Sequence, residues 1–356
     1  MSSLNASDAG LLTDPPPAAV RVFELHGPGT VRAGSRAVPD DGVLLRVETT
    51  GVCGTDHHFF AGRIPVPLPC LLGHEVIGRL ERLPDGHGLV ETGEPSLGDR
   101  VLIAPGVPCG DCAGCVREER CLDRPCYGMT MTGDGLTGGF SPLMELLPGT
   151  RVYRVPERAP AARVVFAEPM ACVLSALRKA FGPRYVPRGM DGVVLGFGAL
   201  GVCAAVALTA GGGAVTIVEP DPARRSLAGR LGFVAVASAA EVPAQAGAVV
   251  DAAGTPKAFA SGLGLLGWSG TLVELGNFAD LGAVEVKPSD ICLRDLRVIG
   301  SGETSYDDFG PAIGLVATTP VPLADAVTDV HAFDALADPQ ELFRTPTTGK
   351  AMVRFG

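Results

Sequence analysis

Apolar segments of two kinds alternate through the second half of the chain. Short runs of strand length, GVVL at 192–195 and AVTIV at 214–218, lie on either side of VCAAVALTA, an apolar stretch of helix length. The alternation continues with AVVDAAG at 248–254, AFASGLGLL at 258–266 and TLVELG at 271–276. Strands that alternate with helices in this way predict an α/β domain with a doubly wound parallel sheet.

The first half of the chain has a different pattern, made of short strand-like runs. RVFELHG at 21–27 and VLLRVETT at 43–50 are separated by turns rich in Gly, Pro and Asp. This pattern predicts a β-rich domain. The first 17 residues are rich in Ser, Asp and Pro and lack the charged and apolar regions of a signal peptide, so we expect a loose leader at 1–17.

Composition excludes several classes of protein. The 356 residues suffice for two domains, and 46% hydrophobic with 19% charged residues excludes a disordered chain. A net charge of −10 without a basic block argues against nucleic acid as a partner. The uncharged segment 192–218 is longer than a membrane span, but its seven glycines and its strand–helix–strand pattern exclude a membrane helix.

The ten cysteines are distributed unevenly along the chain. Cys109, Cys112 and Cys115 recur at a two-residue gap, with Cys121 and Cys126 behind them. Closely spaced thiolates of this kind form a closed, structural zinc site. A long chain with cysteines at metal-ligand spacing is typical of a cytoplasmic metalloprotein rather than of a secreted disulfide scaffold.

A second group of possible metal ligands lies in the segment 51–78. It contains Cys53, His57 and His58, and the adjacent pair His74 and Glu75. Thiolate, imidazole and carboxylate are ligands of zinc, and a catalytic zinc site uses three protein ligands and leaves one position open. These ligand types fit a catalytic zinc ion, and the alternative at this point is a buried free cysteine beside surface histidines.

A glycine-rich turn joins the strand at 192–195 to the following helix. Its sequence is Gly196-Phe197-Gly198-Ala199-Leu200-Gly201, and Glu219 ends the next strand. In this position the motif predicts a dinucleotide-binding turn, with the pyrophosphate at the helix N-terminus. Glu219 would bind the adenosine ribose hydroxyls and repel a 2′-phosphate, which favours NAD over NADP.

Two motifs carry a resemblance to a known family. Cys53-Gly-Thr-Asp-x-His58 and Gly73-His-Glu-x-x-Gly78 resemble the catalytic-zinc region of the medium-chain, zinc-dependent alcohol and polyol dehydrogenases, in the sorbitol and threonine dehydrogenase-like branch. The resemblance implies that Cys53 and His74 bind zinc and that Thr55 takes the proton of the alcohol. It further implies the roles of two more side chains: Asp56 would orient His74, and His58 would pass the proton to solvent. The neighbours His57, Phe59 and Phe60 could line the substrate pocket or belong to the core.

The same resemblance extends to ligands outside these motifs. Glu168, in Glu-Pro-Met-Ala, resembles a glutamate that sits at the catalytic zinc of the family, so we take Cys53, His74 and Glu168 as protein ligands. Glu75 would then exchange with bound water or lie behind the ligands, and the sequence leaves open which carboxylate binds. The cysteine segment near 109–126 resembles the family's four-cysteine lobe, with Cys121 as the fourth ligand and Cys126 as the alternative. Arg224 falls where the family places a basic residue near the ribose, which leaves some tolerance for NADP.

The resemblance implies an architecture and an activity. We expect a GroES-like β-rich catalytic domain at 18–165, a Rossmann domain at 166–300, and a C-terminal return to the catalytic domain at 301–356. The expected activity is hydride transfer between a secondary alcohol, in a polyol, sugar or amino-alcohol, and NAD, with zinc in catalytic and structural sites. A non-catalytic zinc- and nucleotide-binding protein is the alternative. The family also suggests a homodimer or homotetramer.

Overall fold

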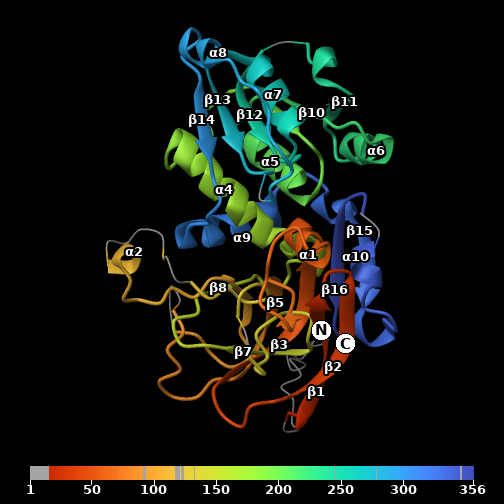
Figure 1. Ribbon diagram of the computed structural model, residues 1–356. Helices are drawn as coiled ribbons and strands as arrows, with labels where there is room; N and C mark the ends of the chain where they lie inside the picture. The colour runs from red at the N-terminus through yellow and green to blue at the C-terminus, as the bar shows by residue number, and fades with distance from the viewer. Residues whose placement is uncertain are drawn as a thin grey trace, which may run out of the picture.

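The computed structural model describes residues 16–90, 94–116, 121, 124–131, 133–243, 245–277, 279–344 and 347–356. Residues 1–15 of the expected leader lie outside this part of the chain. The molecule has two halves (Figure 1): a parallel sheet with its helices, and a β-rich half that contains the N-terminal strands and the last strand.

The nucleotide half is built on a six-stranded sheet in the order β11-β10-β9-β12-β13-β14, and all its neighbouring strands are parallel. Its strands are β9 (Gly192–Leu195), β10 (Val215–Val218), β11 (Val234–Val236), β12 (Ala246–Asp251), β13 (Leu266–Glu274) and β14 (Arg297–Gly300). Its helical segments are α5 (Ala199–Ala210), α6 (Pro222–Arg230), η1 (Ala239–Glu241), α7 (Pro256–Leu265) and α8 (Pro288–Cys292). This arrangement confirms the predicted doubly wound sheet.

The uncharged segment 192–218 folds as β9, α5 and β10, all within the nucleotide half. All four residues of β9 are buried, because the strand lies between β10 and β12 near the centre of the sheet. In the part of the chain that the model describes, no helix is both long and apolar enough to cross a membrane.

The β-rich half contains two sheets. A three-stranded sheet has the order β2-β1-β4, and a seven-stranded sheet has the order β15-β16-β3-β5-β6-β8, with β7 paired to β3. The strands are β1 (Ala19–Gly27), β2 (Thr30–Ala37), β3 (Val43–Val52), β4 (Cys70–Leu71), β5 (Glu75–Arg82), β6 (Arg100–Ile103), β7 (Leu143–Leu146), β8 (Val152–Arg154), β15 (Val327–Ala332) and β16 (Lys350–Arg354). Short helical segments are α1 (Gly54–Phe60), α2 (Ala113–Val116), α3 (Ala161–Val164), η2 (Tyr306–Asp308), η3 (Leu323–Ala326), η4 (Phe333–Ala335) and α10 (Glu341–Arg344).

Strand β16 pairs antiparallel with β3, with Ala351 opposite Val52. Segments far apart in the sequence therefore form adjacent strands of the β-rich half, as Figure 1 shows beside α1. This pairing brings the start of β16 next to the residues that precede α1, where the possible catalytic zinc ligands begin.

Two helices, α4 (Ala167–Phe181) and α9 (Phe309–Thr318), pack against each other between the two halves (Figure 1). The buried carboxylate of Asp308 links them, because it accepts hydrogen bonds from Ser175 Oγ at 2.6 Å and from Arg178 Nε at 3.2 Å. Its other oxygen accepts a bond from Tyr185 Oη at 2.9 Å. This network holds α4, the helix that carries Glu168, in a fixed position.

Candidate active site

The start of helix α1 places the first metal-ligand candidate. Cys53 is the N-cap residue, and its backbone N–H donates to Asp56 Oδ2 at 2.9 Å. The other oxygen, Oδ1, lies 3.5 Å from His74 Nδ1. Asp56 is fully buried, so one carboxylate fixes both the backbone of Cys53 and the ring of His74.

Strand β5 supplies the other two members of the group. His74 precedes the strand and Glu75 begins it, opposite Gly51 of β3. The ligand atoms of Cys53, His74 and Glu75 all lie within 4.8 Å of one another, and His74 and Glu75 are buried. Pairing between β3 and β5 therefore converts a sequence separation of about twenty residues into one cluster.

The polar atoms of this cluster indicate what it holds. Oε1 of Glu75 is buried without a hydrogen-bond partner, and His74 Nδ1 faces Asp56 Oδ1 at 3.5 Å, so the other ring nitrogen of His74 is the one left for a metal. Burial acts to lower the pKa of His74, and the charges of Asp56 and Cys53 outweigh it and raise that pKa well above its usual value. Buried polar atoms with no partner are costly, and a zinc ion satisfies a thiolate, an imidazole and a carboxylate together. The residues present fit zinc.

Lys350 is a member of the site that the sequence analysis missed. It begins β16, it is almost completely buried, and its ammonium group contacts Glu75 Oε2 and donates to the carbonyl oxygen of Val52 at 3.1 Å. Burial acts to lower the pKa of Lys350, but the charge of Glu75 outweighs it and raises the pKa. Lys350 therefore stays charged beside Glu75 and leaves Oε1 of that carboxylate for a metal.

Glu168 lies near the cluster but outside the group whose ligand atoms meet. Its Oε1 is 3.5 Å from Cys172 Sγ, one helical turn further along α4, and Cys172 is in turn 3.0 Å from Thr304 Oγ1. Burial, and after it the charge of Glu75, raises the pKa of Glu168 to about 7. Between the two carboxylates that the sequence left open, the geometry favours Glu75 as the third ligand and places Glu168 close behind it.

Thr55 and His58 lie on the same short helix as the Cys53 cap. His58 Nδ1 is 3.5 Å from Arg63 Nη1, and burial together with the charge of Arg63 lowers its pKa, so its ring is neutral near pH 7 and can accept a proton. The three neighbours belong to the packing around α1. Phe59 is buried in the core, while His57 and Phe60 pack against Phe343 of α10.

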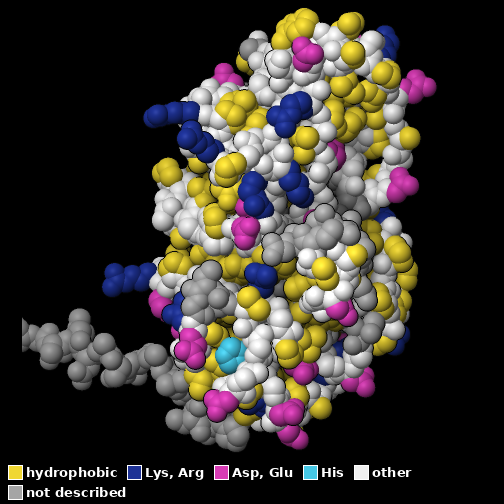
Figure 2. Space-filling model, turned by 90° about the vertical axis from the view of Figure 1, so that its left-hand side faces the viewer, with side chains coloured by type: hydrophobic (Ala, Val, Ile, Leu, Met, Phe, Trp, Pro, Cys, Tyr) yellow, Lys and Arg dark blue, Asp and Glu magenta, His cyan; other side chains and the backbone are white. Residues whose placement is uncertain are grey.

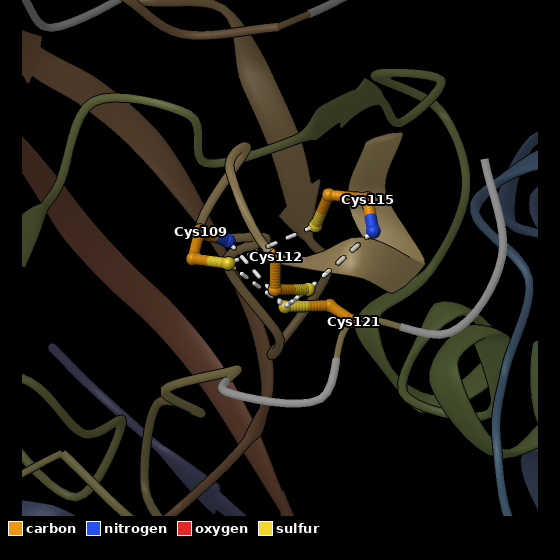
Figure 3. Close-up of side chains that lie close together, drawn as sticks. All are labelled: Cys109, Cys112, Cys115 and Cys121. Atoms are coloured by element: carbon orange, nitrogen blue, oxygen red, sulfur yellow. Dashed lines mark hydrogen bonds between the residues drawn. The ribbon is translucent and has the colours of Figure 1, made fainter. Parts of the chain in front are cut away.

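A second cluster of metal-ligand candidates lies in the cysteine segment (Figure 3). Sγ of Cys121 is 3.5 Å from that of Cys109 and 3.9 Å from that of Cys112, and Cys109 and Cys115 are 3.8 Å apart. The four thiols form one group with no other residue type in it. Cys126 is buried outside the group, with its Sγ 3.6 Å from the carbonyl oxygen of Arg124. The geometry therefore favours Cys121 over Cys126 as the fourth ligand.

The glycine-rich turn lies at the carboxyl end of β9, where the strand order reverses between β9 and β12. Gly196 has a φ of +85°, and a Cβ on Gly201 would lie 2.1 Å from the carbonyl oxygen of Gly196, so only glycine allows this close approach of helix and strand. Gly198 caps α5, and a Cβ there would enter open space. With Ala199 and Leu200 in the first turn of α5, this cradle fits a pyrophosphate.

Glu219 follows β10 and reaches back to this turn. Its Oε2 accepts the backbone N–H of Phe197 at 2.8 Å, and its Oε1 accepts that of Asp221 at 2.9 Å. Arg224 Nη1 lies 4.0 Å from Glu219 Oε2, and Arg224 Nη2 donates to Thr347. The structure thus brings Glu219 and Arg224 together at the edge of the predicted cofactor site.

Two family models match the chain in the order of its two halves. The model described as "Alcohol dehydrogenase GroES-like domain" matches residues 39–157, and "Zinc-binding dehydrogenase" matches residues 199–318. The chain is 30% identical over 335 residues to a 5-exo-hydroxycamphor dehydrogenase of Pseudomonas putida. The matched region covers 88% of this chain and 91% of the relative. The chain belongs to the zinc-dependent medium-chain alcohol and polyol dehydrogenase family.

This chain is also similar to a probable D-xylulose reductase A of Aspergillus terreus, with 27% identity over 93% of this chain and 96% of the relative. An alcohol dehydrogenase from Thermotoga maritima has a similar structure, with a TM-score of 0.85 at 22% identity, over 95% of this chain and 100% of that chain. The structure of an L-idonate 5-dehydrogenase from Escherichia coli matches with a TM-score of 0.79 at 21% identity, over 95% of this chain and 98% of that chain. These structures share the fold of the dehydrogenase.

Membership in this family confirms the predicted enzyme class. The dehydrogenase is an oxidoreductase that acts on alcohols, with zinc and a nicotinamide dinucleotide as cofactors. The relatives give no support to the alternative of a non-catalytic zinc- and nucleotide-binding protein.

The two carboxylates at the catalytic cluster should be separable by metal affinity. We expect Glu75→Gln to weaken binding of the catalytic zinc more than Glu168→Gln does, because Glu75 meets Cys53 and His74 while Glu168 does not. A chelator titration of the two variants measures the order. The reverse order would identify Glu168 as the ligand and Glu75 as the carboxylate that exchanges with water.

Replacing one cysteine of the lobe should remove one metal ion and leave the other. Native dehydrogenase should contain about two zinc ions per chain, and Cys115→Ser about one, with a lower melting temperature because a closed site contributes directly to folding. Elemental analysis and thermal unfolding measure both. Cys126→Ser is the matched control and should retain both ions. A metal-free protein that remained folded and active would contradict both zinc assignments.

Proposed function

We propose that the protein interconverts a secondary alcohol, in a polyol, sugar or amino-alcohol, and its ketone, with NAD as the hydride acceptor. The observation that carries this proposal is the group of Cys53, His74 and Glu75, with Thr55 on the helix that Cys53 caps, in a chain that also contains a dinucleotide-binding turn. The names of the relatives, a hydroxycamphor dehydrogenase and D-xylulose reductases, support the same class of reacting groups.

The protein side chains would hold and orient the reacting groups. Cys53, His74 and Glu75 would bind zinc, and Asp56 would fix the ring of His74 through Nδ1. When bound, zinc lowers the pKa of an alcohol at its open position, and the nicotinamide ring accepts the hydride. Lys350 would place its positive charge beside the carboxylate of Glu75 in a buried site.

A route for the proton follows from the residues on α1. The hydroxyl of Thr55 would accept the hydrogen bond of the substrate hydroxyl and pass its proton towards His58. His58 is suited to receive it because its ring is neutral near pH 7 and partly exposed. On the cofactor side, Glu219 would accept the hydroxyls of the adenosine ribose while it anchors the turn at Phe197.

A substrate screen tests the proposed function. Zinc-loaded protein is mixed with polyols, aminocyclitols, sugars and simple secondary alcohols, with NAD or with NADP, and the absorbance of the reduced cofactor is followed. We expect reduction of NAD with one of the first three classes and no reduction by a Cys53→Ala variant. Failure of zinc-loaded protein to reduce either cofactor with any of these alcohols would refute the proposal.

The protein is also proposed to act as a homodimer that forms at the β14 edge of the nucleotide sheet. β14 is an edge strand, and beside it Trp268, Leu293 and Val298 are exposed, the first two by more than 70%. Hydrophobic side chains gather at this end of the molecule, which carries α8 (Figure 2). An open strand edge with exposed large apolar side chains is typical of a self-association surface.

Sedimentation of two variants tests this dimer. Trp268→Glu should halve the mass of the assembly, because it places a charge at the proposed contact. Val234→Glu changes a valine that is also exposed, at the opposite edge strand β11; it is the control and should leave the mass unchanged. A native protein that sediments as a monomer would contradict the proposal.

We further propose that the protein resides in the cytoplasm, because the cysteines of both metal-ligand clusters must be reduced to bind zinc.

A further inference from the structure

Two carboxylates outside the zinc site end neighbouring strands of the nucleotide sheet. Asp251 is the last residue of β12 and Glu274 the last of β13, and the two are directly opposite in the parallel register. Asp251 is fully buried. One oxygen of each, Asp251 Oδ2 and Glu274 Oε2, is buried with no hydrogen-bond partner. Two buried acceptors beside each other, both without a donor, require a proton or a cation between them.

The other two oxygens hold the turns that follow the strands. Asp251 Oδ1 accepts the backbone N–H of Ala253 at 2.9 Å and lies 3.4 Å from that of Gly254. Glu274 Oε1 accepts the backbone N–H groups of Gly276 and Asn277, both at 2.9 Å. Each carboxylate is therefore the anchor of its own turn at the carboxyl edge of the sheet.

These turns touch each other and the glycine-rich turn. A Cβ on Gly276 would lie 2.2 Å from the backbone nitrogen of Gly254, and a Cβ on Gly196 would lie 2.8 Å from Cα of Ala253. The turns after β9, β12 and β13 thus form one stack with backbone contacts throughout. Since dinucleotides bind at the carboxyl edge where the strand order reverses, between β9 and β12, this stack forms one wall of the cofactor site.

We infer that Asp251 and Glu274 share one proton between Oδ2 and Oε2, and that this proton holds the stacked turns in the arrangement that receives the dinucleotide. The inference rests on the proposed function, because the dinucleotide is its ligand. The pair acts by positioning backbone, since each carboxylate accepts the N–H groups of the turn that follows its own strand. Loss of the proton to solvent leaves two like charges side by side, which pushes the ends of β12 and β13 apart.

Among the described residues, no positively charged side chain pairs with Asp251 or Glu274. The titratable group that faces Asp251 is Glu274, and neither carboxylate forms an ion pair or hydrogen bond with a lysine or arginine in this part of the chain. Asp280 lines the same surface hollow as Glu274 and is acidic as well, so it cannot neutralise the pair. The other neighbours carry no ionisable side chain: Leu195 and Gly196 of the β9 end, and Ala253, Gly254, Gly276 and Asn277 of the turns. A proton is therefore the group that fits between the two oxygens.

The sign of the pH dependence follows from the same geometry. Burial, and the charge of Glu274 after it, raises the pKa of Asp251 from 3.8 to about 7. A pKa raised by folding contributes stability that is complete below the unfolded value of 3.8 and is lost as the pH rises through about 7. Because the cofactor prefers the protonated arrangement, its dissociation constant should increase above neutral pH.

Titration of zinc-loaded protein with NADH, followed by fluorescence, tests this inference. For the native protein we expect the dissociation constant to rise about fivefold or more between about pH 6 and about pH 9. Asp251→Asn and Glu274→Gln should bind NADH with little change over this range, because an amide N–H replaces the shared proton. Glu241→Gln, an exposed carboxylate of the same half, is the matched control and should follow the native curve.

Each outcome of this titration bears on the inference. A flat native curve, or variants that keep the native pH dependence, would overturn it while leaving the proposed function intact. Absence of NADH binding at every pH would contradict the proposed function as well. If the isosteric variants do not fold, hydrogen exchange in the native protein gives the answer, because protection of the Gly254 and Gly276 amides should fall above neutral pH. Unchanged protection there would equally overturn the inference.

Discussion

Replacing Cys53 by alanine is expected to lower kcat/KM for the alcohol by about a thousandfold or more. The thiolate is one of three side chains whose ligand atoms meet at the catalytic cluster, and without it the site keeps one imidazole and one carboxylate. Loss of the metal removes several kcal/mol of charge stabilisation, and each 1.4 kcal/mol is a factor of about ten in rate. Steady-state kinetics and elemental analysis of the same sample measure both effects.

Two further variants make this result specific. Cys292→Ser, an exposed cysteine outside both clusters, should keep native activity and metal content. Asp56→Asn should lose about tenfold to a hundredfold, because it weakens the hold on His74 and the Cys53 backbone without removing a ligand. If Cys53→Ala retained full activity with its zinc bound, the assignment of this cluster as the catalytic site would be wrong.

The second large effect concerns the choice of cofactor. We expect the native protein to prefer NAD to NADP by about a hundredfold or more in kcat/KM, because a 2′-phosphate would meet the buried charge of Glu219. Glu219→Ser should lose efficiency with NAD and gain it with NADP, as Arg224, now 4.0 Å from that carboxylate, becomes available to the phosphate. The ratio of the two efficiencies, measured for native and variant protein, tests this expectation.

A second variant separates charge from shape at the same position. Glu219→Gln keeps an oxygen that can accept the Phe197 N–H and removes only the charge, so it should move the ratio part of the way towards NADP. Adding Arg224→Ala to Glu219→Ser should abolish the gain with NADP. A native preference for NADP would show that Glu219 serves the turn alone and does not select the cofactor.

The predictable parts of this protein are those whose signal lies within a short segment. The doubly wound sheet follows from alternating apolar runs, and Gly196 and Gly201 occupy their predicted turn because backbone approach at these two positions excludes a side chain. The cysteines of the lobe lie close in sequence, so their spacing alone brings them to one group.

The parts that sequence reasoning did not find depend on contacts between distant segments. Lys350 contacts Glu75 only because β16 pairs with β3, and no residue spacing in the sequence predicts that these two strands pair. The pair Asp251 and Glu274 was likewise hidden, because register between two strands decides which residues stand opposite. The sequence does contain one signal in both cases: an ionisable residue lies within or beside an apolar run. Such a residue becomes buried and therefore needs a polar partner from another part of the chain.

Strand β16 also has a consequence for the order in which the molecule is made. Lys350 donates to Val52 across 298 residues of chain, and the whole nucleotide half is synthesised between them. A nascent chain therefore carries the Glu75 carboxylate long before Lys350, its cationic partner, leaves the ribosome. Every strand of the nucleotide half has been synthesised before Lys350 is added. The nucleotide half can mature first, and the catalytic cluster reaches its final charge balance as a late event of biosynthesis.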